Sequence, residues 1–526
     1  MALRHISLVL ALLMSAAPAP AAELRVGMKG VVDGPDPHQS FSPNRNVQLH
    51  VYETLLTQDE HLRPYPLLAE SWRAVDPVTW EFTLRPGVLF SDGTPLTPAD
   101  VAFSIMRAKA ATGIRTYAPN VRNVVSVEPT GPRTLLVHLA VPTPLQPALF
   151  VSVAIVSAKA AGDNPTNADW NGGRAAIGTG PYRWIKWTAS QDVVLARNDA
   201  YWGVREPWDR VTFRFISNDS SRVAALLAGD IDIADTLPAE LYDRVRGSEK
   251  VKLISIDSIF TNYLYLDSMS ATSPNVLGPD GQRLPRNPLR DVRVRTAIDH
   301  ALNREILAER AMQGGAAAAG QIAAPGLIGH VEDLQPTRVD PALSRRLLAE
   351  AGYPQGFTLA LTCTSDRFAG DSRTCQTVGQ MLSAIGIKAQ IEALPTVVYF
   401  RRWATMNAEN QSDFSATISM FGSTSGLASE GMNTILHTPN PERGQGASNR
   451  RFYSDTILDT MLEAADATFD DAKRERLTQD AVRYAMAQRA ALPLFFLKAS
   501  WGVRRDLVLA PRADQYTMVT TVRPAP

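Results

Sequence analysis

Helical and strand-like segments alternate along the sequence from residue 341 to residue 497. The stretch 341–351 (PALSRRLLAEA) has the apolar spacing of an amphipathic helix and ends at Gly352, and the next apolar stretch, 357–363, is typical of a strand. Such alternation is typical of α/β folds with partly parallel sheets, and we expect that fold class here. The later segments are predicted helices at 373–384, 397–406, 454–468 and 470–488, and predicted strands at 387–393 and 492–497.

The length of the chain predicts more than one core. A chain of 526 residues exceeds the size that one hydrophobic core usually supports, so we expect two or more lobes. Alternating residues predict a first strand at 24–29, and the apolar spacing of 44–56 predicts a helix. The stretch 178–182 (GTGPY) predicts a tight turn whose glycines permit positive φ. Two separate strands are expected at 251–256 and 262–266.

The N-terminus has the pattern of a secretory signal peptide. Arg4 and His5 precede an apolar run at 6–17, and a short segment rich in small residues, PAPAAE, follows it. The run is too short to span a bilayer as a mature helix, and we expect cleavage after Ala21, with cleavage after Ala22 as the alternative. No later stretch reaches about 18 consecutive apolar residues. Since no cysteine lies near the cleavage site, we expect an exported periplasmic protein without a lipid anchor.

Charge and cysteine usage narrow the possible partners. Lys plus Arg and Asp plus Glu both number 53, and no long run of either sign occurs, which argues against a nucleic-acid or anionic-membrane surface. The two cysteines, Cys363 and Cys375, are close in sequence, and in an oxidising compartment such a pair favours a disulfide. The alternative is two small buried side chains. A metal site is disfavoured, because two cysteines without nearby histidines cannot supply the four ligands of a tetrahedral metal ion.

The sequence contains no recognisable catalytic constellation. The stretch 422–426 (GSTSG) resembles a nucleophile elbow, but its central residue is Thr424 rather than serine. The eight histidines are scattered, and the acidic stretch 230–235 lacks the glycine and the later glutamate of a calcium-binding loop. We therefore expect a protein that is not an enzyme and that uses neither a metal nor a cofactor.

Several short motifs, in order across nearly the whole mature chain, resemble the periplasmic solute-binding proteins of ABC importers. The resemblance is to family 5, the group that binds peptides, nickel and opines. Each motif alone is a modest scaffold signal, whereas their order and spacing together are specific. The motifs are YETLLT at 52–57, PLLAESW at 66–72, TWEFTLRPGVLFSDGTPLTPADVAFS at 79–104, GTGPY at 178–182, RNDAYWG at 197–203, RVAALLAGDIDI at 222–233, LRDVRVRTAIDHALNRE at 289–305 and LLAEAGYPQGF at 347–357.

The resemblance implies a periplasmic binding protein fold of class II, cluster C type, with two α/β lobes, an extra subdomain and a ligand cleft between the lobes. The chain would cross between the lobes near 261–266 and 493–498, so that a bound ligand closes the hinge. A monomer that passes its solute to inner-membrane permease subunits is expected. The predicted division is a signal peptide at 1–21, a first lobe at 22–50, 175–262 and 493–526, the extra subdomain at 51–174 and a second lobe at 263–492.

One wall of the expected cleft differs from that of peptide-binding relatives. Those relatives carry an acid in a Gly-Trp-x-x-Asp type segment, where it pairs with the ligand ammonium. The corresponding stretch here is 420–431 (MFGSTSGLASEG), in which Phe421 stands near the aromatic position, Ser423 and Ser425 are neutral, and the nearest acid is Glu430. Hydroxyls offer only ordinary hydrogen bonds to an ammonium. The resemblance therefore implies a polar or anionic organic solute rather than a peptide with a free amino terminus.

Further ligand contacts are expected from both lobes. Arg367 matches an arginine with which relatives of the dipeptide subgroup hold a carboxylate, and its planar fork can form two bonds with an anionic group. The alternative for Arg367 is a solvated loop arginine. Residues after the first strand and near the two crossings are expected to contact the ligand or else to serve turns and packing: Ser42, Asn44, Arg45, Phe260, Asn262 and Trp501.

Two other functions stay open at the level of the sequence. A receptor of the same fold could bind an oligopeptide or dipeptide, an opine, a glycoside or a metal chelate. An exported hydrolase or isomerase is the alternative outside the transport class, and turnover of a substrate would distinguish it from a receptor that returns its ligand unchanged.

Overall fold

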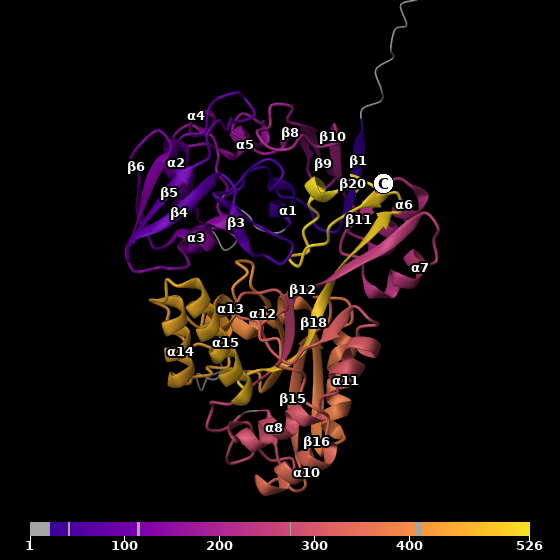
Figure 1. Ribbon diagram of the computed structural model, residues 1–526. Coiled ribbons are helices and arrows are strands. Elements are labelled where there is room, and N and C mark those ends of the chain that lie inside the picture. Colours follow the sequence, from indigo (N-terminus) through magenta and orange to yellow (C-terminus); the bar gives the residue numbers. More distant parts are fainter. Residues whose placement is uncertain (1–21, 40–42, 113–115, 274, 405–412) are drawn as a thin grey trace, which may run out of the picture.

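Figure 1 shows the chain as a computed structural model, which describes residues 22–39, 43–112, 116–273, 275–404 and 413–526. The predicted signal peptide with its cleavage site after Ala21 lies outside the described residues, as does Ser42. In the part of the chain that the structure describes, no helix is long and apolar enough to cross a membrane.

The first lobe is built on parallel strands. The strand β1 (Glu23–Met28) lies between β10 (Arg210–Phe215) and β11 (Ile233–Ala234) and is parallel to both. Leu24, Val26 and Met28, at alternate positions of β1, are buried in the core of this lobe, as the alternation in the sequence predicts. The remaining elements are α1 (Asn44–Gln48), β8 (Tyr182–Thr188), β9 (Asp192–Arg197), α6 (Asp219–Ala228), α7 (Tyr242–Arg246), β19 (Leu507–Val508) and β20 (Arg523–Pro524).

The extra subdomain has a core of its own. Its antiparallel sheet has the order β4 (Ala69–Asp76), β5 (Thr79–Leu84), β7 (Thr134–Leu139) and β6 (Val124–Pro129). The helix α2 (Pro98–Ala110) packs Val101 and Ile105 into the same core as Phe82 of β5. The smaller elements are β2 (Leu56–Gln58), β3 (Pro64–Pro66), α3 (Gln146–Leu149), α4 (Ala158–Ala161) and α5 (Asn167–Asn171).

The second lobe contains the predicted alternation of helices and strands. The strand β15 (Phe357–Thr364) is parallel to both β16 (Ile387–Leu394) and β17 (Ala416–Gly422), and α11 (Asp371–Ser383) connects β15 to β16. The α/β fold class is thereby confirmed. The other elements are β13 (Val276–Leu277), α8 (Val292–Ala301), α9 (Arg304–Ile306), β14 (Ala316–Ala318), α10 (Pro341–Glu350), α12 (Thr396–Ala404), α13 (Ala428–Ile435), α14 (Thr456–Asp466) and α15 (Asp471–Ala487).

Two long antiparallel strands connect the lobes. In Figure 1, β12 (Val251–Leu266) and β18 (Leu492–Arg504) run side by side from the first lobe into the second. Their register shifts between Asp257 and Thr261, where a bulge interrupts the ladder, so the two strands predicted at 251–256 and 262–266 are one irregular strand. The sheet that they complete has the order β13-β15-β17-β12-β18-β11-β1-β10-β9-β8, with β14 beside β18 and β16 beside β15.

The helix predicted at 44–56 is wrong beyond Gln48, where α1 ends. The carbonyls of the following residues bond to distant segments instead of to the next helical turn: His50 accepts from Tyr182, and Val51 accepts from Gly180. The glycines of GTGPY serve this contact. Neither Gly178 nor Gly180 has a positive φ, but a Cβ at Gly178 would lie 2.0 Å from the Val51 carbonyl oxygen, so the glycine is required by close approach of two backbones.

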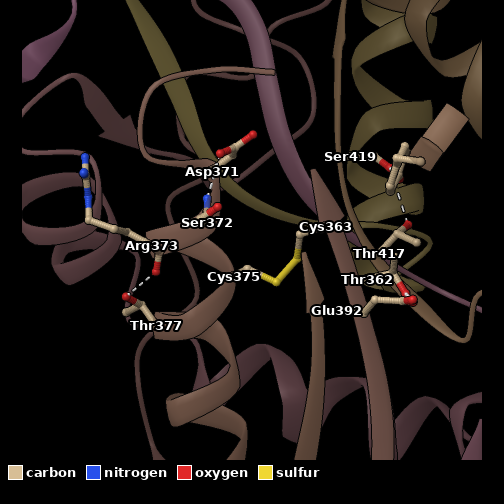
Figure 2. The surroundings of a disulfide bond; sticks show 11 residues. Thr362, Cys363, Asp371, Ser372, Arg373, Cys375, Thr377, Glu392, Thr417 and Ser419 are labelled. Atoms are coloured by element: carbon tan, nitrogen blue, oxygen red, sulfur yellow. Dashed lines mark hydrogen bonds between the residues drawn. A yellow bond between two sulfur atoms is a disulfide. The ribbon is translucent and has the colours of Figure 1, made fainter. Parts of the chain in front are cut away.

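Cys363 at the end of β15 and Cys375 in α11 form a disulfide, with 6.2 Å between their Cα atoms. Figure 2 shows the bond between the strand and the first turns of the helix. The loop that the disulfide closes, 364–374, contains Arg367. The disulfide therefore fixes both ends of the segment that carries the expected anion-binding residue.

Glu53, which follows α1, is a buried carboxylate at the contact of the first lobe and the subdomain. Its side chain accepts hydrogen bonds from the Tyr201 hydroxyl at 2.8 Å and from Trp202 Nε1 at 2.9 Å. Burial raises the pKa of Glu53 to about 7, although these donors favour the ionised form.

Replacing Glu53 with glutamine should change the pH dependence of stability. The pKa of Glu53 is higher in the folded protein than its ordinary 4.5, so its stabilising contribution is complete below about pH 4.5 and is lost as the pH rises through about 7. Between about pH 5.5 and about pH 7.5, the free energy of unfolding of the wild type should fall by about 2 kcal/mol relative to that of Glu53→Gln. Urea unfolding across this range measures the difference. The exposed Glu249, changed to glutamine, is the control and should run parallel to the wild type; a parallel curve for Glu53→Gln would contradict the assignment.

Candidate functional site

A cavity of about 310 Å³ lies between the two lobes, where β12 and β18 pass from one to the other. The first lobe lines it with residues 236–239, Tyr242 of α7 and Gln515, and the second lobe lines it with Met312, residues 367–369 and Met420. The volume lies within the range of small-molecule sites, and a position between lobes is typical of them. The cavity is therefore the candidate binding site.

Three of the residues singled out in the sequence meet in this cavity. Phe260 of β12, Arg367 of the loop between β15 and α11, and Trp501 of β18 all line it. The Trp501 ring is 1% exposed, and its Nε1 donates to Thr517 Oγ1 at 2.9 Å, so the ring is a fixed wall. The roles of these residues toward a ligand stay predictions.

Arg367 is held in place by contacts that include no carboxylate partner for its guanidinium among the described residues. Its backbone N–H donates to Asp371 Oδ2 at 2.9 Å, and its Nη2 donates to the Met420 carbonyl oxygen at 3.2 Å. Its guanidinium also lies 5.0 Å from the ring centroid of Phe400. Burial lowers the pKa of Arg367, which means that the site disfavours the charge until an anion balances it. Asp371 thus positions the Arg367 backbone in addition to beginning α11.

The charge lining the cavity is positive. Besides Arg367, Lys29 at the end of β1 and Lys498 of β18 line it, and none of the lining residues is an aspartate or glutamate. In a partly enclosed space, uncompensated cations attract an anion more strongly than they would in bulk water. The sequence analysis missed both lysines, although the predicted first strand ends at Lys29 and the predicted crossing 493–498 ends at Lys498.

The serines of the segment 420–431 turn away from the cavity. Ser423 Oγ donates to Glu430 Oε2 at 2.7 Å, and the Ser425 hydroxyl donates to the same oxygen. Phe421 packs against α13, close to Gly431. Both serine hydroxyls donate hydrogen bonds to Glu430 within the same segment. Ser423, Ser425 and Phe421 do not line the 310 Å³ cavity. Glu430 instead lines a separate space of about 350 Å³ between the subdomain and the second lobe.

Asn44 and Arg45, which were expected to contact the ligand from the stretch after β1, also lie outside the cavity. Asn44 is buried, and its Oδ1 accepts from the Asp33 backbone N–H at 2.9 Å. Arg45 donates from Nη2 to the Val151 carbonyl oxygen at 2.6 Å, which ties α1 to the subdomain. Both side chains therefore have structural roles, which the sequence analysis gave as the alternative to ligand contact.

Asn262 adjoins the wall of the cavity without lining it. It is fully buried and pairs in the sheet with Met420, which does line the cavity, and with Phe495. Neither its Oδ1 nor its Nδ2 has a hydrogen-bond partner among the described residues. A buried amide without partners costs about 1–3 kcal/mol. Contact of Asn262 with a ligand stays a prediction.

No arrangement for metal binding occurs in the described part of the chain, where no group of three or more His, Cys, Asp or Glu side chains is placed to hold an ion. The lining of the cavity itself offers cations, hydroxyls, an amide and aromatic faces for recognition.

Comparisons with known proteins find similarity over most of the chain. The model of the family described as bacterial extracellular solute-binding proteins, family 5 Middle, matches residues 63–442. The glutathione-binding protein GsiB of Salmonella typhi is 28% identical over 450 residues, which cover 84% of this chain and 82% of the relative.

Solved structures share the two-lobed fold. HbpA2 from Haemophilus parasuis superposes with a TM-score of 0.81 at 21% identity, covering 95% of this chain and 99% of the other. AgaA from A. tumefaciens R10 in complex with agropinic acid superposes with a TM-score of 0.71 at 22% identity, covering 95% and 98%. The predicted fold, with two lobes and a cleft between them, is thereby confirmed.

Proposed function

The chain belongs to family 5 of the bacterial extracellular solute-binding proteins, the receptors of ABC importers, and on this premise we propose that it captures an anionic organic solute between its lobes. The observation that carries the proposal is the lining of the 310 Å³ cavity, with three cationic side chains and no carboxylate. Arg367 receives the anionic group, because its guanidinium is half-buried, has no carboxylate partner among the described residues and faces the cavity.

Capture works by closure of the second lobe, proposed to comprise 263–492, onto the first. A ligand drives such a change only through tighter binding to the closed state. The bulge in β12 between Asp257 and Thr261 provides a hinge, since the ladder with β18 is interrupted there. Contacts across the cleft favour closure, among them the ion pair of Arg373 Nη2 on α11 with Glu240 Oε1 at 2.7 Å. The pair is partly exposed and contributes little by itself.

Glutathione is a specific candidate, because a relative with 28% identity carries its name. Glutathione has two carboxylates, which suit the cationic lining, and one ammonium, for which the cavity lines no carboxylate. An acid without an amino group is the competing ligand. In either case the protein is a periplasmic receptor that acts as a monomer, keeps its solute unchanged and delivers it to the permease subunits of the importer.

Identification of the retained solute tests the proposal. The protein is purified from periplasm without dialysis, denatured, and its released small molecules are identified by mass spectrometry. We expect an anionic organic compound at close to one equivalent, and we expect the same compound to raise the melting temperature when it is added back, since a ligand of the folded state stabilises by mass action. A cationic solute, or conversion of the compound to a product, would contradict the proposed function.

A further inference from the structure

The cavity between the lobes holds more positive charge than a single anionic group balances. Arg367 belongs to the second lobe, Lys29 directly follows β1 in the first lobe, and Lys498 lies in the part of β18 that joins the two. Like charges that line one cavity repel each other, and the repulsion grows as closure removes water. What surrounds each cation therefore decides how many anionic groups a ligand must supply.

Lys498 has no ion pair within the described ranges. The residue opposite it in the ladder of β12 and β18 is Asp257, which does not line the cavity. Burial raises the pKa of Asp257 despite the nearby lysine, so the negative charge on this neighbour is disfavoured. The backbone N–H of Lys498 donates to the Gly315 carbonyl oxygen at 3.0 Å, which fixes this residue against the second lobe.

Lys29 has a partner, but a shared and exposed one. Its Nζ lies 3.1 Å from Asp219 Oδ2, and the side chains of Lys29 and Asp219 are 46% and 31% exposed. The same carboxylate pairs through Oδ1 with the buried Arg222 at 2.5 Å. The Asp219 carboxylate is thus shared between Lys29 and Arg222. An exposed ion pair such as that of Lys29 is weak. The positive charge of Lys29 remains available at the cavity.

We infer that the solute carries two anionic groups, one bound by Arg367 and the other by Lys498 with the help of Lys29. The inference rests on the proposed function and specifies its ligand as a dianion that bridges the two lobes. A monoanion leaves Lys498 or Arg367 unpaired in the closing cavity, which is costly in a desolvated site. A dianion balances both, so the cationic lining selects for two anionic groups and against one.

Matched ligand pairs test this inference. Straight-chain dicarboxylates from succinate to pimelate, together with glutathione, are titrated calorimetrically into the full mature protein, each against the analogue in which one carboxylate is an amide. The tightest dicarboxylate should bind at least about 10-fold more strongly than its monoamide, since each charge-assisted contact is worth about that much. In Lys498→Gln this preference should fall below about 3-fold, because the dicarboxylate loses the partner of its second carboxylate and the monoamide no longer leaves a lysine unpaired.

The control is Lys388→Gln, a lysine on the exposed face of β16 outside the cavity, which should keep the full preference. Equal affinities of wild type for a dicarboxylate and its monoamide would overturn the dianion. So would a Lys498→Gln variant that weakens both ligands equally, or a cleft-bound solute with one anionic group while no dicarboxylate binds. In these three outcomes solute binding persists, so the receptor function stands; a protein that retains and binds no solute contradicts the proposed function itself.

Discussion

Arg367→Ala is expected to weaken binding of the anionic solute by about 10- to 150-fold, or about 1.5–3 kcal/mol. The guanidinium lines the cavity, and the contacts that it makes with described residues, to the Met420 carbonyl oxygen and the Phe400 ring, involve no carboxylate, so its charge is available to the ligand. Removing it takes away the cation that the second lobe contributes and leaves the anionic group of the ligand facing an uncharged wall. Isothermal titration with the solute recovered from the protein measures the loss.

Two further variants make this measurement specific. Arg367→Lys keeps the charge but loses the planar fork, so its affinity should lie between that of the wild type and that of Arg367→Ala. Arg401→Ala removes an exposed arginine of α12 outside the cavity and should leave the dissociation constant unchanged. A dissociation constant of Arg367→Ala equal to that of the wild type would exclude the ligand role and leave Arg367 as a structural loop residue.

Removal of the disulfide should lower the free energy of unfolding by about 3 kcal/mol, the value expected for a closed loop of roughly this length. Cys363 and Cys375 are 12 residues apart and connect β15 to α11 in the core of the second lobe. Because the closed loop carries Arg367, we also expect reduction to weaken ligand binding. Chemical unfolding with and without dithiothreitol, followed by a probe in the second lobe, measures the stability effect.

The double variant Cys363→Ala, Cys375→Ala provides the control, since its stability should not respond to dithiothreitol at all. Its two small side chains replace sulfurs that are almost completely buried, at 1% and 0% exposure, so some loss from packing will add to the loss of the cross-link. Full labelling of both thiols in unreduced periplasmic protein would show that the bond does not form there.

Some of the residues that were expected to contact the ligand line the cavity, and others do not. Phe260, Arg367 and Trp501 lie next to the two crossings of the chain or in a segment matched to relatives, and all three line the cavity. Ser423 and Ser425 were expected to face the ligand, but Glu430 of the following helix accepts their hydroxyls. A helical turn brings that acid back onto the serines, and residue spacing alone does not reveal which side chain accepts the bond.

The sequence by itself determined the class of the molecule. Periodicities of about 3.6 and 2 residues define which face of each helix and strand is buried, so the elements of the second lobe and the α/β class follow from local patterns. The pairing of the two cysteines follows from their closeness in sequence and the expected oxidising compartment. The order of the motifs determined the family.

Only the tertiary structure decided what the cleft contains. Lys29 and Lys498 are separated by most of the chain and meet because β1 and β18 lie in one sheet with only β11 between them. Residues 50–51 are not helical as predicted, because their carbonyl oxygens accept hydrogen bonds from the backbone N–H groups of Tyr182 and Gly180. Contacts of this kind depend on how distant segments close on one another, and the free energy of such closure is not encoded in any short stretch of residues.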